Sequence, residues 1–301
     1  MASLSLGLDA GGTKTAALAS AGDVPQRFGG PGAQATRDGP DAAADQIAAL
    51  VAEIRESFGG ASVDALAVGL AGAGSADVRE RVEQALASRL DATHLAVTHD
   101  ADIALEAAFG DQSGAVLLVG TGSMLYARPV EGDATRAGGW GPALGDDGSG
   151  AALGRAALRA ALAALDGGPP TTLAERLAED HGLGDRAAIV AAAHDASASL
   201  ARFAPALLAA ASDDDWQATT LLARETNALG QQAGWLATRV GDTVTPRLAL
   251  FGGLTGESVY LASISAALER YLPGWEVERA EVEPVDGAFA LAQRLGAAAA
   301  R

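Results

Sequence analysis

The sequence predicts an α/β fold in two halves, because one arrangement of strands and turns occurs twice. Residues 5–23 read "SLGLDAGGTKTAALASAGD", and residues 115–133 read "AVLLVGTGSMLYARPVEGD". Each segment has an apolar strand, a turn of glycine and threonine, a second strand and an acidic turn. Strand-length apolar runs alternate with longer helical stretches in both halves, which is typical of α/β domains. We therefore infer an internal duplication.

The first predicted domain covers residues 1–112. Its strands are apolar runs, expected at residues 4–9, 13–20, 63–72 and 94–98. Its helices are expected at residues 40–58, 76–90 and 99–110, the last capped by an aspartate of "HDAD". The segment 28–40, "FGGPGAQATRDGP", is interpreted as a glycine-rich link.

The second predicted domain covers residues 113–286. A glycine-rich block at 137–154 follows its opening hairpin, and helices are expected from there to about residue 239. The segment 247–258, "RLALFGGLTGES", is predicted to be an apolar strand that ends in glycines and precedes a helix. A last helix, residues 287–301, is expected to complete the first domain.

Composition narrows the possible functions. The 301 residues are 49% hydrophobic, which is sufficient for two cores, and the formal net charge of −17 disfavours nucleic-acid and anionic-membrane partners. The chain has no cysteine, which excludes disulfides, thiolate metal sites and cysteine-held iron–sulfur clusters. It has neither a basic leader nor an apolar run of ~20 residues, so we expect a cytoplasmic protein with no membrane partner.

The segment "GLDAGGTKT" nearly matches a P-loop, but Lys14 comes one residue late. Lys14 is also the chain's single lysine. A P-loop needs a helix after its glycines, whereas only about seven residues separate these glycines from the next turn. We therefore predict a β-hairpin. Two such glycine-threonine turns, facing across a cleft, could hold nucleotide phosphates through backbone N–H groups, and Asp9 could hold Mg²⁺ through water.

Five motifs in this order resemble the BadF/BadG/BcrA/BcrD-type ATPase family of the actin/hexokinase-like superfamily. They are "DAGGTKT", "THDAD", "GTGS", "GGWGPALGDDGSG" and "LFGGLTG". The resemblance covers nearly the whole chain and favours the branch of N-acetylglucosamine kinase and bacterial glucosamine kinase. It implies two ribonuclease H-like domains with a central cleft. The absence of cysteine argues against two relatives, the family's iron–sulfur activators and the zinc-containing ROK sugar kinases.

The resemblance also implies which residues bind the nucleotide. The two phosphate loops and the adenosine contact are expected at Gly11, Gly12, Thr13 and Lys14, at Gly120, Thr121, Gly122 and Ser123, and at Gly252 and Gly253. Asp9 is expected to support Mg²⁺, with hydrogen bonding inside its own turn as the alternative. For Lys14 the alternative to a phosphate contact is an exposed strand lysine.

Asp100 of "THDAD" is expected to be the catalytic base. The alternatives are that Asp100 only caps its helix, or that Asp102 is the base. The expected sugar contacts are Gln34, Asp100, Thr121, Gly139, Trp140 and Asp146. Trp140 could instead be a packing residue, and Gln34 stands where relatives commonly have asparagine.

These assignments imply an ATP- and Mg²⁺-dependent hexosamine kinase. It would transfer the γ-phosphoryl group of ATP to the 6-hydroxyl of N-acetylglucosamine or glucosamine. The alternatives are a kinase of N-acetylmuramic acid or a neutral hexose, and a sugar- or nucleotide-binding regulator without turnover. The family resemblance also implies a homodimer.

Overall fold

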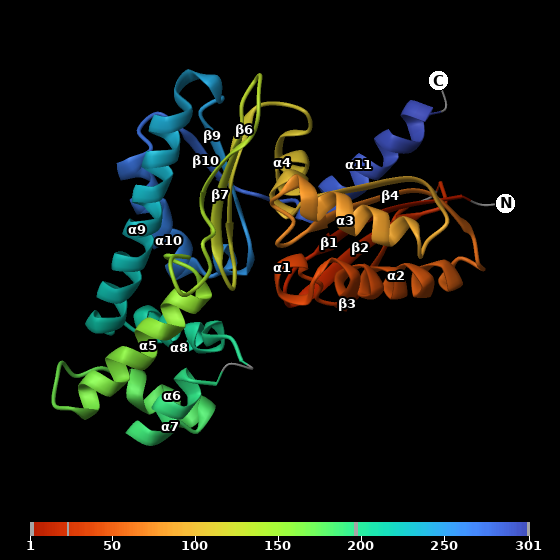
Figure 1. The fold of residues 1–301 in the computed structure, drawn as a ribbon. Helices are drawn as coiled ribbons and strands as arrows, with labels where there is room; N and C mark the ends of the chain where they lie inside the picture. The colour runs from red at the N-terminus through yellow and green to blue at the C-terminus, as the bar shows by residue number, and fades with distance from the viewer. Residues whose placement is uncertain (1–2, 23, 196–197, 300–301) are drawn as a thin grey trace. The chain divides into compact units, whose positions relative to one another are not determined.

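The computed structural model describes residues 3–22, 24–195 and 198–299. By its contacts the chain divides into two compact units: unit 1 holds residues up to 112 and those from 280 onward, and unit 2 holds residues 113–279. Each unit has a five-stranded mixed sheet with helices packed on it (Figure 1). The predicted α/β fold class is confirmed.

The sheet of unit 1 has the strand order β3-β2-β1-β4-β5. Its strands are β1 (Ser3–Ala10), β2 (Lys14–Ser20), β3 (Gln26–Pro31), β4 (Ser62–Leu70) and β5 (Ala92–His99). The first three strands form an antiparallel meander, whereas β4 and β5 run parallel to β1. The carboxyl ends of β1, β4 and β5 therefore meet at one edge of this sheet.

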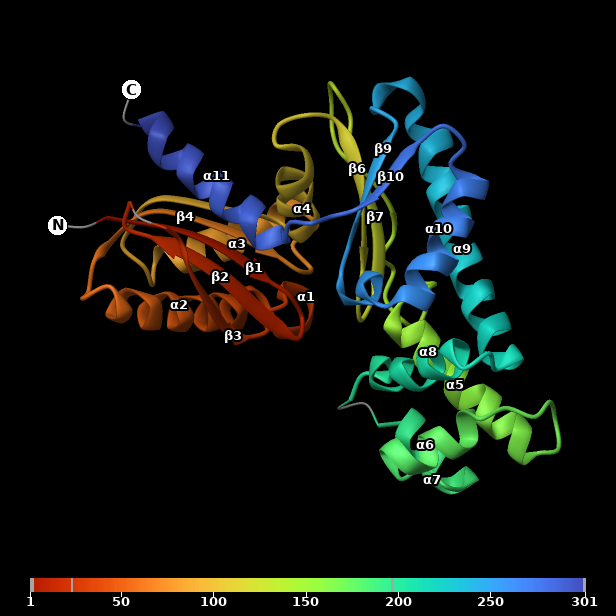
Figure 2. The same ribbon diagram turned by 180° about the vertical axis from the view of Figure 1, so that it is seen from behind.

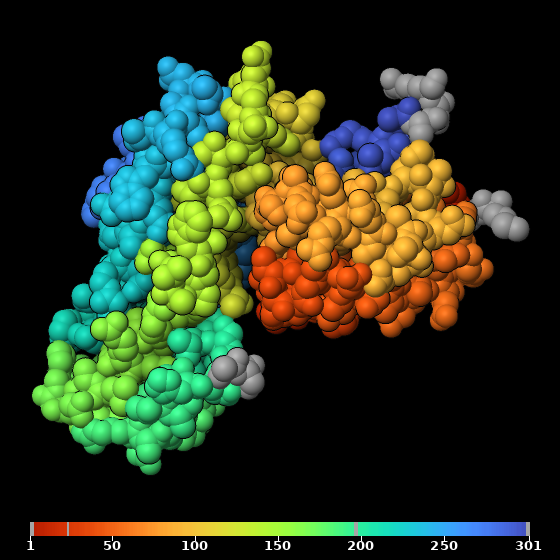
Figure 3. Space-filling model, viewed as in Figure 1, coloured from red at the N-terminus to blue at the C-terminus, as the bar shows by residue number. Residues whose placement is uncertain are grey.

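Two groups of helices pack on this sheet. The helices of unit 1 are α1 (Ala35–Asp38), α2 (Pro40–Ser57), α3 (Ala76–Ala87), α4 (Asp100–Phe109) and α11 (Pro284–Ala299). Apolar side chains of α2 and α3 share a core with Leu6 and Leu8 of β1, and both helices form the outer surface seen in Figure 3. α11 lies across β1 (Figure 2), so closely that a Cβ on Gly7 would stand 2.1 Å from the backbone nitrogen of Phe289.

The sheet of unit 2 repeats this topology. Its order is β10-β9-β6-β7-β8, made of β6 (Gly114–Val119), β7 (Ser123–Arg128), β8 (Thr135–Gly138), β9 (Arg247–Phe251) and β10 (Glu276–Arg279). β6, β7 and β8 form the antiparallel meander, and β9 and β10 run parallel to β6. Read from β8, the order and directions match those of unit 1, as an internal duplication requires.

Unit 2 carries more helix than unit 1. Its helices are α5 (Gly150–Leu165), α6 (Leu173–His181), α7 (Arg186–Ala193), α8 (Ala204–Ser212), α9 (Trp216–Val240) and α10 (Ser258–Tyr271), with the short 3-10 turns η1 (Leu200–Phe203), η2 (Gly241–Thr243) and η3 (Gly253–Gly256). Leucine and alanine side chains of α5, α8, α9 and α10 pack with β6, β7 and β9 in one core. Among the described residues, no helix is long and apolar enough to cross a membrane.

Three strands and one short helix differ from the sequence prediction. The expected glycine-rich link contains part of β3 and all of α1, while β8 and β10 were not predicted. All three strands lie at sheet edges and are only four to six residues long. Edge strands need no alternating apolar pattern, so little in the sequence marks them. The last helix begins at Pro284, a residue that suits a first helical turn, and the contacts divide the chain at 279/280 rather than at 286/287.

Candidate functional site

The first candidate loop is the turn between β1 and β2. The backbone N–H of Gly11 donates to the carbonyl of Lys14 at 3.0 Å and closes the turn. Asp9 pairs with Ala16 across the hairpin, so a strand follows the glycines where a P-loop would have a helix. Any phosphate held here would therefore be bound by hairpin backbone and not by a helix N-terminus.

The peptide between Gly12 and Thr13 is supported by the segment that follows β3. A Cβ on Gly32 would stand 2.6 Å from the carbonyl carbon of Thr13 and 2.7 Å from that of Gly12, so this glycine lets the two backbones touch. Nη1 of Arg37 donates to the carbonyl of Gly12 at 2.6 Å. Oε1 of Gln34 lies 3.0 Å from the place where a Cβ of Gly12 would stand. Gln34 thus lies directly beside the first loop.

Asp9 is half-buried at the end of β1, next to this loop. Burial, more than any other cause, raises the pKa of its carboxyl from 3.8 to about 7. The negative charges of Asp100 and Glu283 raise this pKa as well, while the positive charge of Lys14 lowers it. Asp9 is therefore electrostatically coupled to Asp100, and its charge is costly in the absence of a cation.

Asp100 and Asp102 have different surroundings at the start of α4. Oδ2 of Asp102 accepts hydrogen bonds from Oγ1 of Thr98 at 2.5 Å and from the backbone N–H of His99 at 3.2 Å, so its carboxylate serves as a helix cap. Oδ1 of Asp100 accepts from the backbone N–H of Ala101 at 2.9 Å and lies 3.0 Å from Nδ1 of His99. Asp102 is thus engaged with Thr98 and His99, whereas these two contacts of the Asp100 carboxylate are close to its own position.

The carboxylate of Asp9 and its surroundings are compatible with a magnesium site. No three His, Asp or Glu side chains among the described residues are grouped closely enough to hold a metal by themselves. Mg²⁺ does not require such a cage, because it is usually bound by one or two carboxylates together with waters and substrate phosphates. A single half-buried carboxylate with a raised pKa beside a candidate phosphate loop fits this kind of site, since a cation would compensate its charge.

The second candidate loop, between β6 and β7, is held mainly by backbone. The N–H of Gly120 donates to the carbonyl of Gly122 at 2.9 Å. The N–H groups of Gly150 and Ala151, at the start of α5, donate to the carbonyls of Gly120 and Thr121 at 2.8 and 3.1 Å. The first turn of α5 thereby fixes this loop, and the loop supplies partners for N–H groups that have none within a helix.

Asp146 joins the predicted sugar motif to the second loop. Its backbone has a positive φ of 60°, and its Oδ1 accepts from the N–H of Gly141 at 3.1 Å. Oδ2 lies 2.7 Å from the place where a Cβ of Gly122 would stand. The carboxyl is buried; this burial raises its pKa, as does Asp147, while the Gly141 N–H and Arg155 oppose the rise. Asp146 thus supports the loop in addition to any contact with a ligand.

The other predicted residues of the sugar motif and of the second loop differ in exposure. Trp140 is 61% exposed, and the guanidinium of Arg136 lies 4.6 Å from its ring centroid. This exposure argues against the alternative that Trp140 is a packing residue. Gly139 lies against Met124, whose side chain would be 3.1 Å from a Cβ at Gly139. Ser123 is buried and donates through Oγ to the carbonyl of Asp147 at 2.8 Å.

Gly252 and Gly253, the predicted adenosine contacts, follow the end of β9. Gly252 has a φ of 112°, and a Cβ there would stand 1.9 Å from the carbonyl oxygen of Val119. Val119 ends β6 immediately before Gly120, so Gly252 lies beside the second loop. A Cβ on Gly253 would meet no atom within 4 Å. The structure thus groups the predicted residues into one set in each unit.

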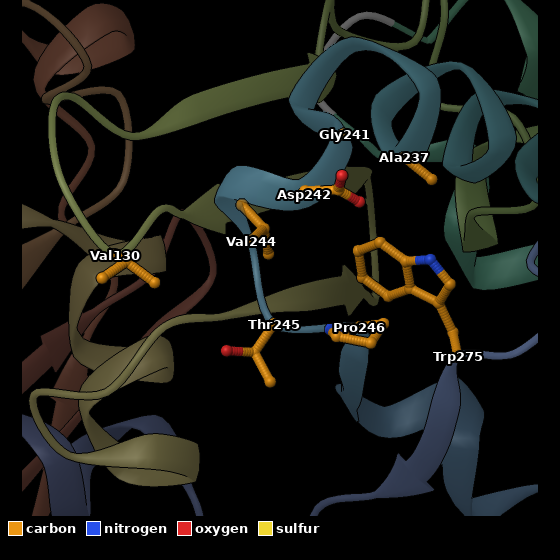
Figure 4. Close-up of a pocket in the computed structure, with 8 residues that line it drawn as sticks. All are labelled: Val130, Ala237, Gly241, Asp242, Val244, Thr245, Pro246 and Trp275. Atoms are coloured by element: carbon orange, nitrogen blue, oxygen red, sulfur yellow. The ribbon is translucent and has the colours of Figure 1, made fainter.

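A surface pocket elsewhere in unit 2 contains none of the predicted residues. It has a volume of about 400 Å³ and is lined by Val130, Ala237, Gly241, Asp242, Val244, Thr245, Pro246 and Trp275. Figure 4 shows the indole of Trp275 beside Asp242 and Pro246. The pocket lies at the start of β9, whereas Gly252 lies at the end of that strand, so it is separate from the second loop.

Three residues near the first loop were not predicted from the sequence. Gly32 and Arg37 contact the loop, and Glu283 influences Asp9 from the segment before α11. Gly32 and Arg37 flank Gln34 within five residues, which is a local signal that could have identified them. Glu283 is about 270 positions from Asp9 in the sequence, and no local pattern marks it.

A family model described as the BadF/BadG/BcrA/BcrD ATPase family matches residues 6–292. The chain belongs to this family. The match includes both hairpin loops, the motif of Asp146 and the glycines after β9. As a member of this ATPase family the protein uses ATP, which agrees with the backbone loops described above.

Individual relatives are similar over different lengths. An N-acetyl-D-glucosamine kinase of Dictyostelium discoideum is 26% identical over 308 aligned residues, covering 95% of this chain and 97% of that protein. An N-acetylmuramic acid/N-acetylglucosamine kinase of Clostridium acetobutylicum is 37% identical over 102 residues, but only 34% of this chain and 33% of that protein are aligned. A crystal structure from Chromobacterium violaceum, provisionally named an N-acetylglucosamine kinase, has a TM-score of 0.76 and 26% identity, covering 96% of this chain and 99% of that one.

Proposed function

We propose that the protein is an ATP-dependent hexosamine kinase that phosphorylates the 6-hydroxyl of N-acetylglucosamine or glucosamine. The observation that carries this proposal is the placement of Asp9 near the carboxyl end of β1 and of Asp100 directly after β5, because these strand ends lie at the same edge of one sheet. In phosphoryl transfer one carboxylate can hold the cation that neutralises the phosphate charge, and another can orient the attacking hydroxyl. The N-acetylglucosamine kinases to which the chain is similar over nearly its full length support the substrate class.

In the proposed reaction Asp100 accepts a hydrogen bond from the sugar hydroxyl and orients it toward the γ-phosphorus. A bond forms between that oxygen and the γ-phosphorus, the bond to the oxygen of ADP breaks, and the hydroxyl proton passes to Asp100. The phosphates are bound by backbone N–H groups of the two hairpin turns other than those of Gly11 and Gly120, which close the turns themselves, with Lys14 as an added charge. Mg²⁺, supported by Asp9, neutralises the phosphate charge when bound.

The remaining contacts follow from the same assignment. Gly252 and Gly253 would approach the adenosine, and the sugar would meet Gln34, Thr121, Gly139, Trp140 and Asp146. Exposed Trp140 offers an aromatic face, and buried Asp146 offers an acceptor for hydroxyl groups. We further propose that the enzyme acts in the cytoplasm as a homodimer.

The second candidate substrate is N-acetylmuramic acid. The local 37% identity to a kinase named for both N-acetylmuramic acid and N-acetylglucosamine favours it over a neutral hexose. A regulator without turnover is the remaining alternative, but it would not need the coupled pair of Asp9 and Asp100.

The test is an ADP-release assay on glucosamine, N-acetylglucosamine, N-acetylmuramic acid and glucose, with wild type and Asp100→Asn. We expect amino-sugar turnover by the wild type and a fall in kcat of about 100-fold or more in the variant, with sugar affinity retained. Asp91→Asn, at an exposed position before β5, is the matched control and should remain active. Normal kcat in Asp100→Asn would refute the assignment of the base, and no turnover of any of the four sugars would refute the proposed substrate class.

A further inference from the structure

The peptide group between Gly12 and Thr13 is held in one orientation by groups outside its own hairpin. Its carbonyl carbon and oxygen each lie 2.7 Å from the place where a Cβ of Gly32 would stand, and its carbonyl accepts from Arg37 at 2.6 Å. A trans peptide is planar, so its C=O and N–H point in opposite directions. Since Arg37 holds the carbonyl of Gly12, the N–H of Thr13 must point away from Arg37. Arg37 thereby determines where one donor of the candidate phosphate loop is aimed.

Arg37 is itself oriented by Asp38. Nε and Nη2 of the guanidinium donate to Oδ1 and Oδ2 of Asp38 at 2.6 and 2.8 Å, which is the two-point geometry that makes arginine–carboxylate pairs specific in direction. The third nitrogen, Nη1, is then left to reach Gly12. An isolated lysine in this place could not make all three contacts in one plane.

The same carboxylate fixes the backbone at Gln34. Oδ2 of Asp38 accepts from the N–H of Gln34 at 2.9 Å, and the carbonyl of Gln34 accepts from the N–H of Asp38 at 2.9 Å. Gln34, the proposed sugar contact, and the peptide at Gly12 therefore have one support in common. That support is the single turn of helix α1.

We propose that Arg37 is a positioning residue, which aims the Thr13 N–H at a nucleotide phosphate and is supported by Asp38. This inference rests on the proposed function, because it requires that the hairpin turn binds the phosphates of a nucleotide. Arg37 contacts the loop carbonyl and no reacting atom, so it acts through the loop. Its side chain is 51% exposed, and exposed ion pairs add little to stability, so its role is not to hold the fold together.

The test is calorimetric titration of the full chain with Mg²⁺ and the non-hydrolysable analogue AMPPNP, without sugar. We expect Arg37→Ala to weaken analogue binding about tenfold, because the donor is no longer pre-oriented, while the midpoint of thermal unfolding stays within a degree or two. Arg37→Lys keeps the positive charge but loses the paired guanidinium hydrogen bonds to Asp38, so it should recover only part of the affinity. Asp38→Asn leaves Arg37 in place and should give a smaller loss than Arg37→Ala.

The matched control is Arg89→Ala. Arg89 belongs to the same unit and pairs through Nε with Asp45 at 2.6 Å, but its contacts lie on α2 and at the end of α3, away from the hairpin turn. This variant should bind the analogue as the wild type does. Unchanged affinity in Arg37→Ala, full recovery in Arg37→Lys, or an equal loss in Arg89→Ala would each overturn the proposal.

Turnover separates this inference from the proposed function. If the wild type phosphorylates an amino sugar, Arg37→Ala should raise the KM for ATP about tenfold with a smaller change in kcat, as expected for a residue that binds through the loop. If no sugar is phosphorylated but the analogue titration still shows the loss, the proposed substrate is wrong and the role of Arg37 stands. If sugar is phosphorylated and analogue affinity is unchanged, only the role of Arg37 is wrong.

Discussion

The two hairpin loops have the same place in the same topology but are supported by different means. The loop at 120–123 is fixed by backbone bonds from the start of α5 and by the contact of Gly252 with β6. The loop at 11–13 has one backbone bond of its own and otherwise depends on the segment 32–38. The second loop has a different support, because α5 begins directly against it and bonds to it through backbone N–H groups.

This difference predicts that the second loop affects mainly the stability of the fold, whereas side chains around the first loop affect mainly ligand binding. Backbone hydrogen bonds from a buried helix turn do not depend on which side chain occupies a position, so the second loop should tolerate side-chain replacement but not backbone displacement. The first loop should respond to single side chains with little change in the fold. The following predictions can contradict or refine that distinction.

The largest effect is expected for Gly252→Ala in the second loop. Its φ of 112° suits glycine alone, and the added Cβ would stand 1.9 Å from the carbonyl oxygen of Val119. Strain and overlap together should lower the free energy of unfolding of unit 2 by about 4 kcal/mol. All four tryptophans lie in unit 2, so urea unfolding followed by tryptophan fluorescence reports on this unit.

Gly253→Ala is the matched control for this substitution. A Cβ there meets open space, so its unfolding curve should superimpose on that of the wild type. Equal stability of the two variants would show that the second loop is not fixed by close backbone contact.

The next effect concerns pH and Asp9. The pKa of Asp9 is about 7 in the folded protein, against about 3.9 in an unfolded chain. Between these values the folded state keeps a proton that the unfolded state releases, so the free energy of unfolding must fall as pH rises. The contribution is complete below about pH 4 and is lost as pH passes through 7.

We therefore expect Asp9→Asn to be equal in stability to the wild type near pH 4 and more stable by roughly 2–4 kcal/mol at pH 8. Thermal unfolding without ligand, followed by circular dichroism at both pH values, measures this difference. A stability difference that does not change with pH would mean that Asp9 has an ordinary pKa and that its carboxyl does not stay protonated in the folded protein near neutral pH.

The smallest effect on the fold, but a clear one on binding, is expected for Gly32→Ala. The Cβ would overlap the Gly12–Thr13 peptide at 2.6–2.7 Å, and the loop must move. We expect the affinity for the nucleotide analogue to fall about tenfold, with a loss of stability of roughly 1 kcal/mol. Gly29→Ala on β3, where the nearest atom would be 3.7 Å away, should leave both unchanged.

Much of the fold is predictable because the central strands are buried on both faces. β1, β4, β6 and β9 are apolar runs that are each followed by a glycine within two residues, and such runs have few other interpretations. The edge strands β3, β8 and β10 escape prediction because they depend on pairing with a neighbour rather than on their own composition. The strand β3, with three of its six residues glycine or proline, has the composition of a loop.

The candidate site shows the same division. Asp9 and the glycines of both loops can be found from the sequence because each follows an apolar strand. The family resemblance of "THDAD" favours Asp100 over Asp102 as the base, but the residues alone do not indicate that Asp102 accepts a hydrogen bond from Thr98. The supports of the first loop, Gly32 and Arg37, lie in a segment that the sequence indicates only as a glycine-rich link, where their nearness to Gln34 is the one local signal. Their roles depend on tertiary contact.

The position of α11 has a consequence for the order in which the protein is made. This helix packs on β1, yet about 170 residues of unit 2 and its connections separate it from the rest of unit 1. On the ribosome, unit 2 emerges as one continuous stretch and has all its strands before α11 exists. At typical rates of synthesis the first sheet waits roughly 10–30 s for its last helix, with the face around Gly7 uncovered meanwhile. The strand that carries Asp9 is therefore translated before unit 2, but its packing is completed only after unit 2 has been made.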